Sequence, residues 1–143
     1  MIKKIKIGKN EVELKVTALL PVVYRQKIGR DIIVDIQKLQ STYSKILDKN
    51  NPQNNFDGLD LTIFMNLAWT MAYHAYTSRL KEANKIANTE ARNEEISKIA
   101  VIPDNPEDWM DEFDGVFDIY EALPQIIELW NVSSGTTSKP GKK

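Results

Sequence analysis

Apolar and charged residues alternate along the first sixteen residues of the chain with a period of two. The apolar positions are Ile5, Ile7, Val12, Leu14 and Val16. This pattern predicts two strands, at about residues 2–7 and 11–17, joined by a turn at residues 8–10. Because a two-stranded hairpin is only marginally stable by itself, we expect its apolar face to cover helices.

After Thr17 the apolar residues recur at steps of three and four, which is typical of amphipathic helices. We expect a short helix with Thr17 as its N-cap, Pro21 in its first turn and an end near Gly29. A longer helix follows with Asp31 as its cap. The apolar stripe of this helix, which we expect to face the core, consists of Ile32, Ile33, Ile36, Leu39, Tyr43, Ile46 and Leu47. The asparagine-rich run 48–58 predicts a loop.

A central and buried helix is predicted after Asp60, because residues 61–72 are apolar almost all round. Residues 79–98 are polar and alanine-rich, so they have high helix propensity and little to bury. We expect them to form a helix that projects into solvent or lies against a partner, with a break near Asn88.

The C-terminal third begins with Asp104 or Asn105 as the cap of a helix whose first turn contains Pro106. A last amphipathic helix is predicted over residues 116–130, bent at Pro124. Residues 132–143 contain too little apolar surface to order themselves. We therefore predict a single domain over residues 1–131, mainly α with an N-terminal β-hairpin (α+β) and about five helices, followed by a flexible, disordered tail at 132–143.

Composition narrows the classes of function. The 143 residues include no cysteine, which excludes disulfides, thiolate zinc sites and cysteine nucleophiles. No apolar run is long enough for a signal peptide or a membrane span, and a net charge of −1 gives no general reason to expect nucleic acid as a partner. We expect a cytoplasmic protein that binds neither membranes nor nucleic acid.

The charges are unevenly distributed along the chain. Residues 1–49 contain eleven lysines and arginines against five acids, whereas residues 99–138 contain nine acids and no basic residue. Self-association of the opposite ends, or a partner with complementary patches, would use this asymmetry. An ordinary solvated surface is the alternative interpretation.

The ionisable residues form no known catalytic or metal-binding motif. The single histidine, His74, has no second histidine four residues further on, so a structural or merely exposed histidine is expected. The seven acids between Asp104 and Asp118 lack the alternating ligands and central glycine of a calcium loop, which favours a solvated helix face. There is also no glycine-rich phosphate loop. We therefore expect a binding protein, with no enzymatic activity, metal or cofactor.

Aromatic residues are concentrated in the acidic C-terminal third. At helical spacing they belong to the core by default, but exposed tryptophan and tyrosine anchor protein interfaces. The candidate partner-binding residues are Trp109, Phe113, Tyr120 and Trp130. We predict that changing Trp109 or Trp130 to alanine weakens partner binding and leaves the fold cooperative.

Five segments taken together resemble the tail assembly chaperones of long-tailed (siphovirus-type) phages and prophages of Gram-positive bacteria. They are KIGKNEVELKVTALLPVVYRQKIGRDIIVDIQKLQ (6–40), FMNLAWTMA (64–72), PDNPEDWMDEF (103–113), FDIYEALPQIIELWN (117–131) and TTSKP (136–140). Their order and spacing match over most of the chain. The stretch 77–99 is longer than the family pattern, and Leu20 stands where a polar helix cap would be expected.

This resemblance implies an assembly factor of the bacterial host cytoplasm that is absent from the mature virion. It would bind and solubilise the tape measure protein and help to recruit tail tube subunits, mainly through a longer, frameshifted form. The alternatives are another small phage structural protein, such as a head-tail connector or tail terminator, or a metal-dependent hydrolase. The hydrolase would use Asp104, Asp108 and Asp111.

Overall fold

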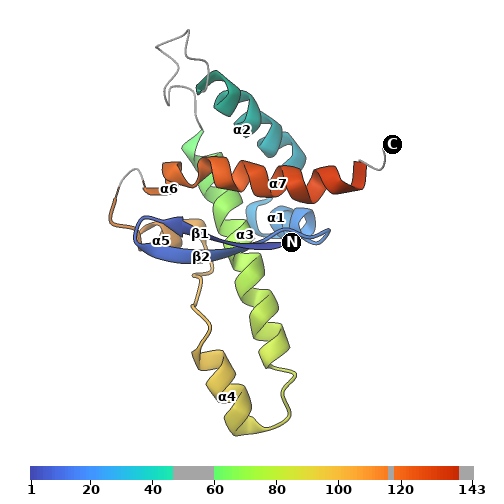
Figure 1. The fold of residues 1–143 in the computed structure, drawn as a ribbon, viewed down its shortest axis with the longest axis vertical. Helices are drawn as coiled ribbons and strands as arrows, with labels where there is room; N and C mark the ends of the chain where they lie inside the picture. Colours follow the sequence, from blue (N-terminus) through green and yellow to red (C-terminus); the bar gives the residue numbers. More distant parts are fainter. Residues whose placement is uncertain (47–59, 116–117, 139–143) are drawn as a thin grey trace.

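The computed structural model describes residues 1–46, 60–115 and 118–138, and helices dominate it (Figure 1). In chain order the elements are β1 (Ile2–Ile7), β2 (Asn10–Lys15), α1 (Leu20–Ile28), α2 (Ile32–Ile46), α3 (Leu61–Ala83), α4 (Thr89–Ser97), α5 (Pro106–Met110), α6 (Asp118–Glu121) and α7 (Leu123–Ser138). The predicted fold class, mainly α with an N-terminal hairpin, is confirmed. The helices exceed the expected five because two regions each form two helices. The predicted loop 48–58 lies outside the described residues.

The two strands form an antiparallel hairpin that lies on α3. Ile5 is opposite Val12, and Gly8 has the positive φ, 62°, that the tight turn requires. The N-terminal ammonium of Met1 donates to the carbonyl of Val16 (2.7 Å), and Val16 N–H donates back to Met1 (2.9 Å). The apolar face of the hairpin is buried against the central helix, as expected.

Helix α3 is the centre of the molecule (Figure 1). The carboxylate of Asp60 accepts from Ile63 N–H (3.1 Å), which confirms Asp60 as the cap. The first part of the helix is buried almost all round, and its fully buried side chains include Phe64, Leu67, Trp69 and Met71. Hairpin, α1, α2 and α5 all contact α3, so one helix carries most of the core.

The far end of α3 and helix α4 form an arm that projects from the body (Figure 1). Helix α4 contains no buried residue. The predicted break near Asn88 is confirmed: α3 ends at Ala83, and the side chain of Asn88 caps α4 by accepting from Ala91 N–H (2.9 Å). The arm therefore follows from a sequence with helix propensity and little apolar surface to bury.

Helices α1 and α2 form a corner around Gly29, which has a φ of 79° and ends α1. The side chain of Asp31 accepts from Ile33 N–H (2.8 Å), as expected of a cap. Thr17 is not the N-cap of α1, since the helix begins later and Leu19 occupies that position. The Thr17 hydroxyl instead accepts from Leu19 N–H (3.2 Å) in the preceding turn.

A buried carboxylate, Asp35, holds this corner together. It accepts from the hydroxyl of Tyr24 (2.6 Å) and from two nitrogens of the Arg30 guanidinium (2.8 and 2.7 Å). The Arg30 hydrogen bonds keep the pKa of Asp35 below its usual value, and burial together with this carboxylate raises the pKa of Tyr24. The network joins α1 to α2.

The C-terminal elements differ from the single bent helix predicted over 116–130. Pro124 lies in the first turn of α7, where its missing N–H is tolerated, so the chain forms the separate helices α6 and α7. Helix α7 continues to Ser138, which means that residues 132–138 are helical rather than part of a tail. Residues 139–143 lie outside the described part of the chain. Lys3 pairs with Glu128 (2.9 Å) and Gln40 donates to Asn131 (2.8 Å), so α7 lies between β1 and α2.

Candidate protein-binding surface

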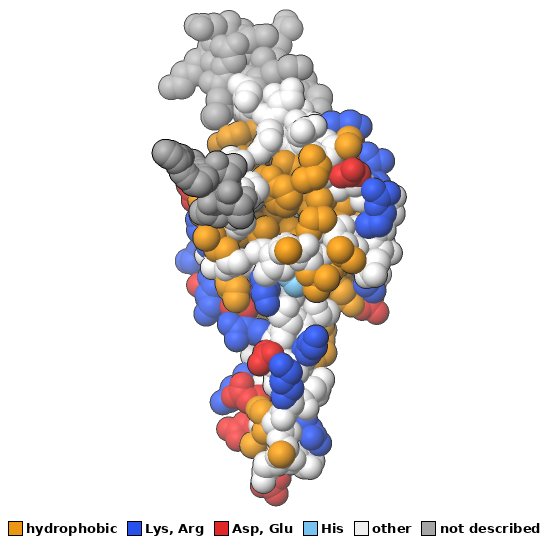
Figure 2. Space-filling model, turned by 90° about the vertical axis from the view of Figure 1, so that its right-hand side faces the viewer, with side chains coloured by type: hydrophobic (Ala, Val, Ile, Leu, Met, Phe, Trp, Pro, Cys, Tyr) orange, Lys and Arg blue, Asp and Glu red, His pale blue; other side chains and the backbone are white. Residues whose placement is uncertain are grey.

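Exposed apolar side chains gather on the side of the molecule that carries α1, the start of α2 and the end of α7. Figure 2 shows this side, with hydrophobic side chains across its centre. The residues that we define as the apolar face are Met1, Ile2, Leu19, Val22, Ile33 and Val132. They come from the chain start, α1, α2 and α7, so no single segment of sequence contains the surface.

Hydrogen bonds between the elements position this face. Gln40 of α2 reaches Asn131 of α7, directly beside Val132. Ile33 lies seven residues before Gln40 and therefore on the same side of α2. At the other margin, the ammonium of Met1 is held on Val16, which keeps the chain start beside the beginning of α1. The surface is thus built on fixed elements.

The apolar side chains here are too exposed to belong to the core. Val22 is 46% exposed, Ile33 is 47% exposed and Leu19 is 53% exposed. Isolated exposed apolar residues are normal, but a contiguous group of them on a monomer often marks a surface that binds another molecule. The apolar face can therefore bury against a partner, and its chemistry suits an apolar stripe of a protein.

Positive charge lies beside this face. Arg25 follows Val22 by three residues and lies on the same side of α1, and Lys15 is directly opposite Ile2 in the hairpin. Figure 2 shows lysine and arginine side chains at the margins of the hydrophobic area, with acidic side chains among them. These charges also act inside the molecule, because Lys15 and the N-terminal ammonium add to burial in lowering the pKa of His74.

His74 is a core residue, so of the two alternatives, structural or merely exposed, the structure favours the structural one. It is 4% exposed, and its Nε2 lies 2.8 Å from the hydroxyl of Thr17. The lowered pKa keeps the imidazole neutral near pH 7, and this contact ties α3 to the segment before α1. Its position supports a structural role for this histidine.

The four aromatic residues predicted to bind a partner do not form one surface. Trp109 is 1% exposed, and its ring meets Phe113 edge-on in the core at a centroid distance of 5.1 Å. The interpretation of Trp109 as a surface anchor is therefore wrong, because its ring has no free face. Phe113 is half-buried beside it, Trp130 is half-buried on α7, and the side chain of Tyr120 lies outside the described part.

Sequence reasoning missed the residues that are exposed. It assigned Ile33 to the core stripe of α2, but Ile33 is exposed whereas Ile32 is buried. Successive residues of a helix are turned by about 100°, so Ile33 points away from the elements that cover Ile32. The runs LLPVV (19–23) and IIV (32–34) contain more consecutive apolar residues than one buried helix face can hold. That excess was the available signal for an exposed surface.

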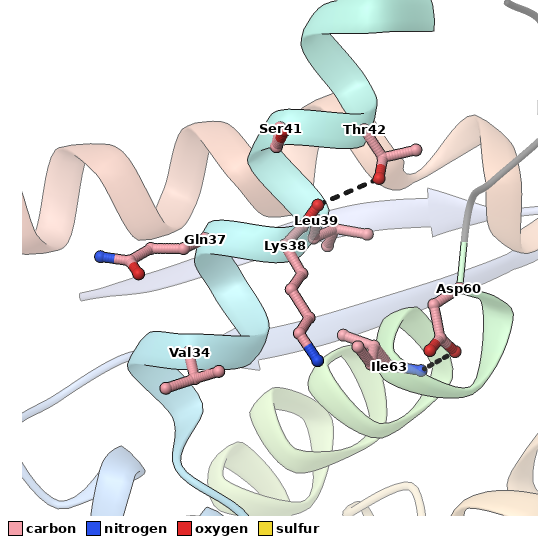
Figure 3. A pocket seen from close by; sticks show the side chains of 8 residues that line it. All are labelled: Val34, Gln37, Lys38, Leu39, Ser41, Thr42, Asp60 and Ile63. Atoms are coloured by element: carbon pink, nitrogen blue, oxygen red, sulfur yellow. Dashed lines mark hydrogen bonds between the residues drawn. The ribbon is translucent and has the colours of Figure 1, made fainter.

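Two hollows lie elsewhere on the described part of the molecule. The first, of about 610 Å³, lies between α2 and the start of α3 and is lined by Val34, Lys38, Thr42 and Ile63 among others (Figure 3). Its polar groups are used locally: Thr42 donates to the Lys38 carbonyl (3.0 Å), and Asp60 caps α3. Figure 3 shows Gln37 pointing away from the other side chains, so polar groups do not converge there.

The second hollow, of about 730 Å³, lies under β2, between α3, the end of α4 and α5. Arg79 donates to Glu13 at its edge (2.6 Å), and this contact lowers the pKa of Glu13. Charges of both signs line the hollow and none of them is buried without a partner among the described residues. It is a mixed surface without a distinct chemical preference.

The acids named for a hydrolase have local partners. Asp104 accepts from the hydroxyl of Tyr73 (3.0 Å), and Asp108 accepts from the side chain of Asn105 (2.9 Å). Asp111 ends α5. Within residues 1–46, 60–115 and 118–138, no group of three or more acidic or histidine side chains is arranged to hold a metal ion.

None of the helices in the described ranges has the length and apolar character needed to cross a membrane. In comparisons with protein-family models, curated proteins and solved structures, no match to this chain was found. The apolar face and the charges beside it are therefore the features that bear on function.

Proposed function

We propose that this protein is a tail assembly chaperone of a long-tailed phage or prophage, and that it binds and solubilises the tape measure protein. The apolar face carries the proposal, because it offers exposed side chains from four elements for burial against a helix of the client. The resemblance of the sequence to tail assembly chaperones supports the identity of the client.

The physical requirements of such a chaperone are modest. A long, helical and partly apolar client aggregates alone, and a small protein can shield it by laying its own helices against the client. Many weakly bound copies along one client are held by avidity, so each copy needs a shallow surface rather than a deep pocket. The protein would act in the host cytoplasm, recruit tail tube subunits mainly through a longer frameshifted form, and leave before the virion is complete.

Co-expression with a tape measure protein tests this proposal. Val22→Asp places a charge in the apolar face and should abolish both co-purification and solubilisation of the client. Val101→Asp is the matched control, because Val101 is 69% exposed on the segment before α5, away from the apolar face. The proposal is wrong if the wild type does not retain the client or if Val22→Asp retains it as well as Val101→Asp.

A second measurement separates a chaperone from a structural component. Mass spectrometry of purified virions should detect the tail tube and tape measure proteins and not this chain. Stoichiometric amounts of the chain in the virion would favour the head-tail connector or tail terminator instead.

A further inference from the structure

We infer that the segment bound by the apolar face is an amphipathic helix with acidic residues beside its apolar stripe. This inference rests on the proposed function and adds the charge and conformation of the bound segment. Three features support it: the charges that border the face, the location of the molecule's own acids and the helices that carry part of the surface.

Basic groups border the face on two sides. Arg25 lies one turn from Val22. Its ionic neighbour among the described residues is Asp31, 3.9 Å away, and both side chains are largely exposed. Lys15 forms no ion pair within the described part of the chain. Its charge adds to the Arg79 hydrogen bond in lowering the pKa of Glu13 and to the Lys85 hydrogen bond in lowering the pKa of Glu82. Such charges remain available to a partner, because a long, exposed pair contributes little by itself.

The acidic residues of the protein are concentrated elsewhere. Residues 104–121 contain eight acids and no base, and they belong to the region of α5 and α6. In Figure 1 these two helices lie on the opposite side of the molecule from the chain start and the end of α7. An acidic segment that approaches the apolar face meets Arg25 and Lys15, with Asp31 beside Arg25, and is far from the acidic region of α5 and α6.

The construction of the face favours a helix as the bound conformation. Val22, Ile33 and Val132 lie on helices α1, α2 and α7, whose backbone groups are hydrogen bonded internally, so these helices offer side chains rather than backbone donors and acceptors. A bound helix likewise has its backbone groups hydrogen bonded internally, and it presents side chains to the surface at steps of three and four residues. Its apolar stripe would cover Val22 and Ile33, and acids flanking the stripe would approach Arg25 and Lys15.

Two synthetic helical peptides test the inference with the full chain. Both carry the same leucine stripe; one has glutamate and the other lysine at the flanking positions. Fluorescence anisotropy at low salt should show tighter binding of the glutamate peptide by on the order of tenfold, and the difference should shrink at high salt as the charges are screened. The double variant Arg25→Glu, Lys15→Glu should reverse the preference.

The control variant Lys9→Glu, Lys81→Glu makes the same change of net charge at exposed positions away from the face and should keep the preference for the glutamate peptide. Val22→Asp should weaken binding of both peptides. Equal binding of the two peptides by the wild type, or failure of both to bind, overturns the inference. Self-association that occupies the face, detected by sedimentation and lost in Val22→Asp, also overturns it. Retention of the tape measure protein is measured separately, so the proposed function can survive either result.

Discussion

Individual polar residues in this protein act mainly as connections between elements. Asp35 joins α1 to α2, and His74 joins α3 to the segment before α1. Asp118 accepts from Gly115 N–H (3.0 Å) and lies against the hairpin turn at Gly8. Each of these side chains is buried or closely covered, so its partner groups have little access to water. Their removal should therefore affect stability more than an average surface change does.

Replacing Asp35 by asparagine should lower the free energy of unfolding by about 2 to 3 kcal/mol. The change removes the negative charge that accepts hydrogen bonds from Tyr24 and Arg30. Denaturant titration measures the loss. Asp31→Asn is the control, since asparagine also caps a helix and the free energy should change little. Equal losses in the two variants would contradict a special role for the buried carboxylate.

Gly8 has two independent reasons to be glycine. Its φ of 62° is unfavourable for other residues, and an added Cβ would lie 2.3 Å from a carboxylate oxygen of Asp118. Gly8→Ala should therefore destabilise the fold more than Gly29→Ala, where φ is 79° but no atom lies within 4 Å of the added Cβ. Thermal unfolding compares the two, and adding Asp118→Ser should recover part of the difference.

The stability of the protein should fall as the pH decreases through the region of the ordinary histidine pKa, 6.5. Burial lowers the pKa of His74 in the folded state, so the unfolded chain binds more protons in this range and is favoured as the pH falls. Unfolding measured between pH 7.5 and 5.5 should show this slope in the wild type and a smaller one in His74→Asn. The low pKa values of Asp35 and Glu13 act in the same direction only at lower pH, near the usual values for carboxyl groups.

At the scale of elements, short helices depend on tertiary contacts. Helix α5 is only five residues long, and its cap, Asn105, accepts from Asp108 N–H (2.8 Å). A helix of this length is not stable alone. The buried side chain of Trp109 holds it against α3, and the indole of Trp69 donates to the Pro103 carbonyl (2.8 Å) just before it. Trp69 and Trp109 thus hold α5 and the segment before it against α3.

Trp109→Ala should cost about 3 to 5 kcal/mol of stability, as expected for removing a large buried side chain. At a temperature where the variant remains folded, its affinity for the partner should equal that of the wild type. Trp130→Ala should cost less, because Trp130 is half-buried. Its effect on partner binding stays as predicted from the sequence: the binding should weaken. Loss of affinity in folded Trp109→Ala would contradict the core role.

At the scale of the whole molecule, charge and apolar surface are separated in space. The acidic α5–α6 region and the apolar face lie on different sides, and the arm of α3 and α4 extends along a third direction (Figure 1). The asymmetry of charge along the sequence thus becomes an asymmetry between sides of the fold. This arrangement is the basis of the proposed binding of an acidic helix.

Much of the architecture could be predicted from local patterns. The hairpin follows from alternation around Gly8, and the caps at Asp31, Asp60 and Asn105 follow from short-range backbone chemistry. The predicted helix boundaries were wrong where contacts with neighbouring elements determine the helix end. Leu19, and not Thr17, is the N-cap of α1, and α7 continues beyond residue 131. Helix ends depend on what packs beside them as well as on propensity.

The sequence by itself determined the fold class, the buried central helix and the polar arm, because each is a property of residues within one segment. Only the tertiary structure decided which apolar residues remain exposed. Ile32 and Ile33 are the same residue type at adjacent positions, yet one is 2% and the other 47% exposed. Exposure depends on the neighbours that each side chain meets, and those neighbours come from distant parts of the chain.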